Sequence, residues 1–132
     1  TYKGMAEYWP TAEAEGEVTG LMNSIAKVVC SRSREKAEWN NTTIVHDTVP
    51  ELQRLKEQGN GPMYIFGSGK LTQSLMNAGM IDEIRLCVAP IILGHGRRLF
   101  TDEYTKRNLT LLESRSLQSG GVILRYEVTN ME

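Results

Sequence analysis

Two short stretches of this 132-residue chain carry residues suited to holding phosphate groups. The first is Ser31-Arg32-Ser33, which follows the apolar run of residues 27–30. An arginine between two hydroxyls can hold one phosphate through charge-assisted hydrogen bonds. Taken alone, the same stretch also fits a solvated surface turn.

The second stretch is Gly67-Ser68-Gly69, which lies between four apolar residues (63–66) and a segment with helical spacing (70–78). The pattern predicts a strand buried on both faces, then a glycine turn, then a helix. Amides at a helix N-terminus and the positive end of the helix dipole favour anions, and glycines let a ligand approach the backbone. A tight turn that binds nothing is the alternative.

Two known phosphate-binding motifs do not match this second stretch. A P-loop needs a glycine five residues before the Gly69-Lys70 pair and Ser or Thr after it, but Tyr64 and Leu71 occupy those positions. The dinucleotide pattern G-x-G-x-x-G has Thr72 at its third glycine. Any phosphate held here is therefore held in another way.

Length, composition and charge favour one globular domain. Hydrophobic residues make up 40% and charged residues 23% of the chain, and the formal charge of −1 argues against nucleic acid as a partner. No apolar run is long enough to span a membrane. Cys30 and Cys87 lie in apolar runs and are expected to be buried free thiols, as in a cytoplasmic protein. No metal-ligating pattern is present, and no metal site is expected.

Strands and helices alternate along the rest of the chain, which ends in a hairpin signal. Helices are expected over residues 1–8, 18–25, from 47–50 to 58, and 70–78. Strands are expected over residues 27–30, 42–45, 63–66, 83–89, 109–117 and 122–128. This order predicts an α/β three-layer sandwich on a mostly parallel mixed sheet with a C-terminal antiparallel hairpin. Ligands bind beyond the carboxyl ends of such strands, where one isolated phosphate and one diphosphate describe NADPH.

Strict alternation in the hairpin puts Leu109, Leu111, Glu113, Arg115 and Leu117 on one face of its first strand. Leu112 and Ile123 fall on the opposite faces, so neither strand is polar on its outer side. Because monomers avoid large exposed apolar patches, the pattern predicts a homodimer through residues 109–128 and 87–93.

Three motifs, in order, resemble the dihydrofolate reductase-like family: residues 27–33, 65–71 and 79–100. The similarity runs over nearly the whole chain and is greatest to relatives of the C-terminal reductase domain of the bacterial riboflavin biosynthesis protein. The resemblance implies the dihydrofolate reductase fold and a homodimer. It also implies NADPH-dependent hydride transfer to a small pterin- or pyrimidine-like heterocycle.

The resemblance assigns cofactor contacts residue by residue. It matches Ser31, Arg32 and Ser33 to the turn that takes the 2′-phosphate. It matches Gly67, Ser68, Gly69, Lys70, Leu71 and Thr72 to the segment that takes the diphosphate. Thr1 resembles the threonine that opens a cofactor-facing helix, normally after a Gly-Arg pair that is absent here. The chain is therefore expected to lack the family's N-terminal strand segment, and no catalytic residue is assigned.

Departures from the family pattern leave the substrate open. In the riboflavin reductases that this chain resembles, a glutamate at the position of Phe66 helps to bind the pyrimidine substrate. A phenyl ring cannot accept the hydrogen bond that this glutamate accepts. The turn is closer to true dihydrofolate reductases, where the matching Gly-Gly bond is cis. Ser68 carries a Cβ, so both cis and trans stay open at Gly67–Ser68. Two alternatives to a reductase are a non-catalytic nucleotide-binding relative and a structural dimerisation module.

Overall fold

The computed structural model describes residues 1–13, 16–59 and 61–129. It divides into two compact units, Thr1–Ser68 and Gly69–Glu132. The expectation of a single domain over the whole chain stays a prediction. None of the helices in the described ranges is long and apolar enough to cross a membrane.

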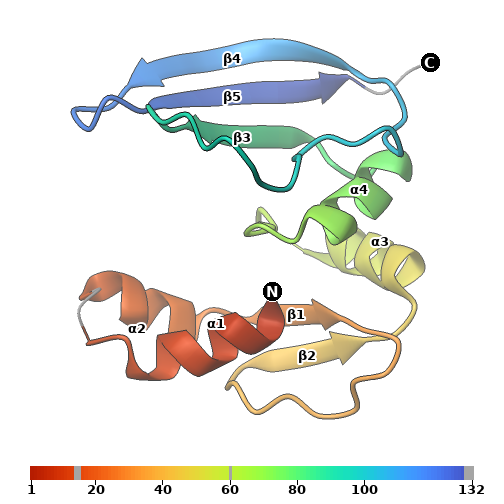
Figure 1. Cartoon of the computed structure of the whole chain (residues 1–132). Helices are drawn as coiled ribbons and strands as arrows, with labels where there is room; N and C mark the ends of the chain where they lie inside the picture. The colour runs from red at the N-terminus through yellow and green to blue at the C-terminus, as the bar shows by residue number, and fades with distance from the viewer. Residues whose placement is uncertain (14–15, 60, 130–132) are drawn as a thin grey trace. The chain divides into compact units, whose positions relative to one another are not determined.

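Up to residue 58, the first unit has the predicted helices and strands in the predicted order, with a short 3-10 helix added after the first helix. It contains α1 (Tyr2–Tyr8), the 3-10 helix η1 (Trp9–Thr11), α2 (Glu17–Ser24), β1 (Lys27–Cys30), β2 (Thr42–Val45) and α3 (Thr48–Gln58). Strands β1 and β2 pair in parallel, with Lys27 opposite Thr42 and Cys30 opposite Val45 (Figure 1). The residues that follow both strands therefore begin at the same edge of this sheet.

Trp39 is the largest side chain in the core of the first unit, at 6% exposure. Its indole N–H donates to Asn23 Oδ1 over 2.7 Å. The amide of Asn23 in turn donates to the carbonyls of Trp9 and Thr19, each over 3.0 Å. Lys27 Nζ lies 4.5 Å from the centre of the Trp39 ring. One buried aromatic side chain thus joins η1, α2 and β1.

Residues 63–66 form no strand in the described structure, so that prediction is wrong. Burial on both faces was its basis, but Met63, Tyr64 and Phe66 are each about half exposed. The rings of Tyr64 and Phe66 stack on each other instead, with centres 6.2 Å apart. Without a strand here, the described residues form one parallel sheet and one antiparallel sheet. The predicted single, mostly parallel mixed sheet is wrong, and the three-layer arrangement stays a prediction.

The described peptide bonds are all trans, so the cis alternative at Gly67–Ser68 is wrong. The turn is made by two consecutive left-handed residues, Gly67 at φ 67° and Ser68 at φ 49°. Glycine adopts this region freely, whereas a residue with a Cβ is strained there. Ser68 therefore carries backbone strain directly before the next helix.

The second unit contains α4 (Gly69–Asn77), β3 (Glu83–Val88), β4 (Asn108–Ser116) and β5 (Val122–Thr129). Helix α4 ends at Asn77, one residue before the predicted end at residue 78, and Gly79 lies in the turn that follows. The amides of Met80 and Gly79 bond to the carbonyls of Leu75 and Met76 over 2.9 and 3.0 Å. Gly79 at φ 70° completes this Schellman motif. The strands form an antiparallel sheet in the order β3-β5-β4, which confirms the C-terminal hairpin (Figure 1).

A β-bulge at Leu112 corrects the predicted faces of β4. Leu111 pairs with Tyr126, but Glu113, two residues later, pairs with the adjacent Arg125. The extra residue moves Leu109 and Leu111 to the opposite face from Glu113 and Arg115. Apolar side chains from all three strands therefore share one face: Ile84, Leu86, Leu109, Leu111, Leu124 and Tyr126.

Charged side chains form a ladder across the other face of the sheet. Arg125 binds both carboxylate oxygens of Glu83 over 3.0 Å and one of Glu113 over 2.9 Å. Arg85 and Arg115 extend the ladder to Glu83 and Glu113 over 2.6 and 3.2 Å. Hydrogen bonds from Arg125 and then Arg85 lower the pKa of Glu83 to about 2.

We expect the Arg125→Met variant to show a weaker dependence of stability on acid. Because the folded-state pKa of Glu83 is depressed, its stabilisation is complete above the ordinary value of 4.5 and is lost as pH falls towards about 2. Thermal unfolding followed by circular dichroism between pH 7 and pH 2 measures this loss. Arg115→Met, which removes one contact at the edge of the ladder, is the control. Identical pH dependence in the wild type and Arg125→Met would contradict the assignment.

We also expect Ser68→Gly to stabilise the folded protein by about 1 kcal/mol, because glycine relieves the left-handed strain. Urea unfolding measures the change. Ser74 lies within α4, so Ser74→Gly should have the opposite sign and lower stability by about 0.5 kcal/mol. A loss of stability in Ser68→Gly would show that the Ser68 side chain contributes more than its backbone costs.

Candidate functional site

The turn after β1 is held to β2 at its first residue. Ser31 N–H donates to Val45 O over 3.0 Å, continuing the parallel pairing. His46, directly after β2, places Nδ1 2.8 Å from Ser31 O. The hydroxyl of Ser31 accepts the N–H of Arg34 over 3.1 Å and closes the turn. Arg32 and Ser33, between these two bonded residues, are exposed.

The far end of this turn contacts the start of α1. The guanidinium of Arg34 lies over the ring of Tyr2, with Cζ 4.8 Å from the ring centre. Tyr2 Oη accepts the backbone N–H of Trp39 over 3.1 Å. Glu38 lies 3.8 Å from the Arg34 guanidinium. The structure thus joins Tyr2, the residue after the N-cap Thr1, to Arg34, the residue after Ser31-Arg32-Ser33.

The segment Gly67–Thr72 turns the chain into α4. Gly69 and Lys70 open the helix and are exposed, whereas Ser68, Leu71 and Thr72 are half-buried. Amides at the start of an α-helix have no acceptor inside the helix, so the amides of Gly69, Lys70 and Leu71 can serve an anion. A side chain from the second unit also contacts this start, because Tyr104 Oη donates to Gly69 O over 3.4 Å.

The donor types in both segments fit the phosphate groups of NADPH. A guanidinium beside two hydroxyls suits a phosphate monoester, and backbone amides at a helix start suit a diphosphate. An added Cβ at Gly67 or Gly69 would meet no atom within 4 Å, so the backbone is open at both positions. Ser31-Arg32-Ser33 belongs to the first unit, as do Gly67 and Ser68, whereas Gly69 to Thr72 belong to the second unit.

Cys30, the last residue of β1, does not supply a nucleophile to this turn. Burial raises the pKa of its thiol, an effect that a hydrogen bond with Thr48 only partly opposes. The thiol therefore stays protonated at neutral pH. Both cysteines are free, as predicted. They were also expected to be buried, but Cys30 is only half-buried and Cys87 is exposed, so that expectation is wrong for Cys87.

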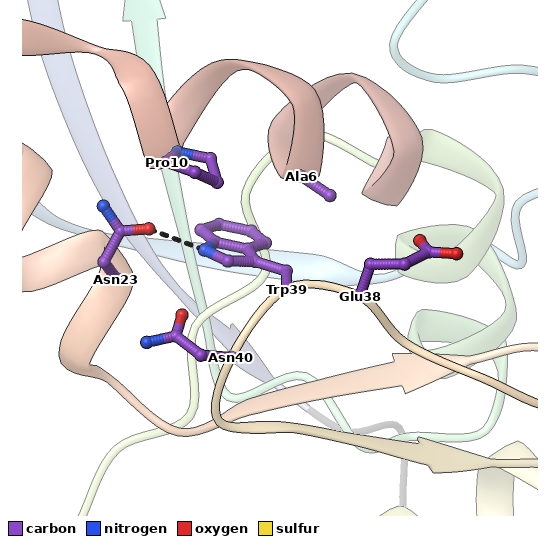
Figure 2. A pocket seen from close by; sticks show the side chains of 6 residues that line it. All are labelled: Ala6, Pro10, Asn23, Glu38, Trp39 and Asn40. Atoms are coloured by element: carbon purple, nitrogen blue, oxygen red, sulfur yellow. Dashed lines mark hydrogen bonds between the residues drawn. The ribbon is translucent and has the colours of Figure 1, made fainter.

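A hollow of about 380 Å³ lies beside Trp39 in the first unit. Figure 2 shows the side chains around it and the hydrogen bond from the indole of Trp39 to Asn23. Its walls are Ala6, Pro10, Asn23, Glu38, Trp39 and Asn40. This set contains none of the predicted cofactor-binding residues, so the hollow is not the predicted site.

Sequence reasoning missed Tyr2 and His46. Neither residue is among the predicted cofactor-binding residues. His46 had a usable signal, because it follows a predicted strand as Ser31 does, and parallel strands end at one edge. Tyr2 had none, because its partners Arg34 and Trp39 lie more than 30 residues away.

Comparison with known proteins gives the family. The model of the RibD C-terminal domain matches residues 2–123. The uncharacterized protein YyaP of Bacillus subtilis is 30% identical over 115 residues, covering 86% of this chain and 61% of YyaP. A 2,5-diamino-6-ribosylamino-4(3H)-pyrimidinone 5′-phosphate reductase of Methanothermobacter thermautotrophicus is 37% identical over 43 residues. That match covers 33% of this chain and 20% of the reductase.

Two solved structures share the fold. A protein assigned to riboflavin biosynthesis in Shewanella sp. PV-4 superposes with a TM-score of 0.71 at 20% identity, covering 90% of this chain and 71% of that one. A pyrimidine reductase-like protein of Corynebacterium diphtheriae gives 0.59 at 17% identity, covering 86% and 53%.

The chain spans less than two thirds of the length of the curated relatives it matches. Within that span, the family model covers nearly all of the sequence, and the two solved structures share its fold. The predicted resemblance to the riboflavin reductase domain is confirmed, and this chain belongs to the RibD C-terminal domain family.

Proposed function

We propose that this chain is part of an NADPH-dependent reductase that acts on a small pterin- or pyrimidine-like heterocycle. The observation that carries the proposal is the turn after β1, where exposed Arg32 and Ser33 follow Ser31 at the carboxyl edge of a parallel pair. When bound, NADPH supplies a hydride. The chain's own residues bind and orient it, and their free thiols accord with a cytoplasmic location.

Each phosphate group has its own set of residues in this proposal. Arg32, with Ser31 and Ser33, binds the 2′-phosphate, which NADPH carries and NADH lacks. The segment Gly67 to Thr72 binds the diphosphate through the amides that begin α4, and Lys70 adds a positive charge. Thr1, at the N-terminus of α1, also contacts the cofactor in this proposal. The membership of the RibD C-terminal domain family supports the reaction class.

Phe66 favours a second candidate, a nucleotide-binding relative without turnover. Its ring is 55% exposed and offers no acceptor to a pyrimidine amide. Both candidates bind NADPH, but only the reductase oxidises it. The absorbance of NADPH, followed with an excess of a pterin or pyrimidine substrate, separates them. It should fall with time if the chain is a reductase and stay constant if the chain only binds the nucleotide. If the chain does not bind NADPH, both candidates are wrong, and a structural dimerisation module is the alternative that is left.

We expect Arg32→Ala to weaken NADPH binding by about 10- to 100-fold, because a hydrogen bond to a charged group contributes roughly 1.5–3 kcal/mol. NADH affinity should hardly change. Quenching of the fluorescence of Trp9 and Trp39 measures both affinities. Arg54→Ala, which removes the same charge from α3, is the control. Equal losses for NADPH and NADH in Arg32→Ala would overturn the role of Arg32.

We also propose a homodimer, through residues 109–128 and 87–93 of the second unit. Exposed apolar side chains support it, with Ile92 98% exposed and Ile91 and Leu93 above 60%. Sedimentation at micromolar concentration should give twice the 14.8 kDa chain mass. Ile92→Arg should shift the population towards monomer. Leu21→Arg on α2, at a side chain of 66% exposure, should not. A monomeric wild type would refute the proposal.

A further inference from the structure

We propose that Tyr2 and His46 are positioning residues, which hold the turn of Ser31 to Arg34 in the shape that recognises a phosphate monoester on a ribose. The inference rests on the proposed function, because it concerns the same 2′-phosphate contact. It adds two residues that touch neither the reacting atoms nor the phosphate and act through the turn.

His46 fixes the first residue of the turn. Its Nδ1 lies 2.8 Å from the carbonyl oxygen of Ser31. A carbonyl only accepts, so Nδ1 carries a hydrogen and donates it. This bond is independent of the ladder bond from Ser31 N–H to Val45 O. Two bonds therefore fix both polar groups of the Ser31 backbone against the residues at the end of β2.

Tyr2 fixes the last residue of the turn. Its ring carries the guanidinium of Arg34, and its hydroxyl is bonded to the backbone of Trp39, a buried side chain. Arg34 also bonds back to the Ser31 hydroxyl through its own N–H. The charge of Arg34 is thus directed to Tyr2 and Glu38.

Arg32 and Ser33 lie between the two fixed residues, Ser31 and Arg34, and are exposed. No hydrogen bond or ion pair joins Arg32 to another residue that the structure describes. A ligand phosphate would meet a turn whose backbone is already ordered, so binding loses less conformational entropy. Loosening either fixed end should weaken contacts to the phosphate monoester and leave the rest of the nucleotide unaffected.

The test uses two probes that differ by one phosphate, adenosine 2′,5′-bisphosphate and adenosine 5′-monophosphate, with calorimetry on the full chain. His46→Ala should weaken the bisphosphate about 5-fold, the scale of one neutral hydrogen bond. The affinity for the monophosphate should change less than 2-fold, because this probe lacks the 2′-phosphate that the turn contacts. His46→Asn should restore the bisphosphate affinity, because its amide nitrogen can stand where Nδ1 stood. His95→Ala, in a loop of the second unit, is the matched control and should change neither affinity.

Tyr2→Leu tests the other end and should weaken the bisphosphate about 10-fold, because it removes both the ring and the hydroxyl. Amide hydrogen exchange at Arg34 gives a second readout. It should speed up in His46→Ala and Tyr2→Leu and stay unchanged in His46→Asn. Thermal unfolding checks each variant. If Tyr2→Leu fails to fold, the exposed His46 series decides the question alone.

Two results would overturn the inference and leave the proposed function standing. In one, the wild type prefers the bisphosphate and His46→Ala binds both probes as tightly as the wild type does. In the other, both probes weaken equally, which marks a merely structural role. A wild type with no preference for the bisphosphate would instead refute the proposed use of NADPH, and the inference with it.

Discussion

A buried indole must find an acceptor for its N–H, and this requirement organises the first unit. Asn23 meets it for Trp39 and uses the other end of its amide on two carbonyls, of Trp9 and Thr19. The backbone of Trp39 in turn holds Tyr2. The helices that precede β1, the loop that follows it and the start of α1 are therefore arranged around one aromatic residue.

The second unit depends on a different balance, between a charged and an apolar face of one small sheet. Arg125 is about a third exposed and shares its guanidinium between two carboxylates from neighbouring strands. Such a network fixes which residues face each other, because a one-residue slip would place charge on the apolar side. Without the bulge at Leu112, Leu109 and Leu111 would lie on the same face as Glu113 and Arg115. The bulge places the two leucines on the apolar face of the sheet.

The sequence predicted much of this from local rules and failed where contacts are distant. Residues 27–30 and 42–45 were predicted as strands because β-branched and apolar side chains mark such runs locally. Residues 63–66 look the same, but burial depends on tertiary packing, and Met63, Tyr64 and Phe66 stay about half exposed. Leu112 resembles any strand residue, so the bulge had no signal. The candidate site residues could be named in advance, but the contacts of Tyr2 and His46 could not.

The bulge also has a consequence for the free edge of the sheet. β4 lies at one edge, where unpaired backbone groups can recruit a strand from another chain. A regular incoming strand cannot match an edge that contains one additional residue near its middle, since its hydrogen bonds fall out of step beyond Leu112. Growth of this sheet by strand addition is therefore disfavoured at β4, which guards the chain against fibre-like stacking while its faces stay available for packing.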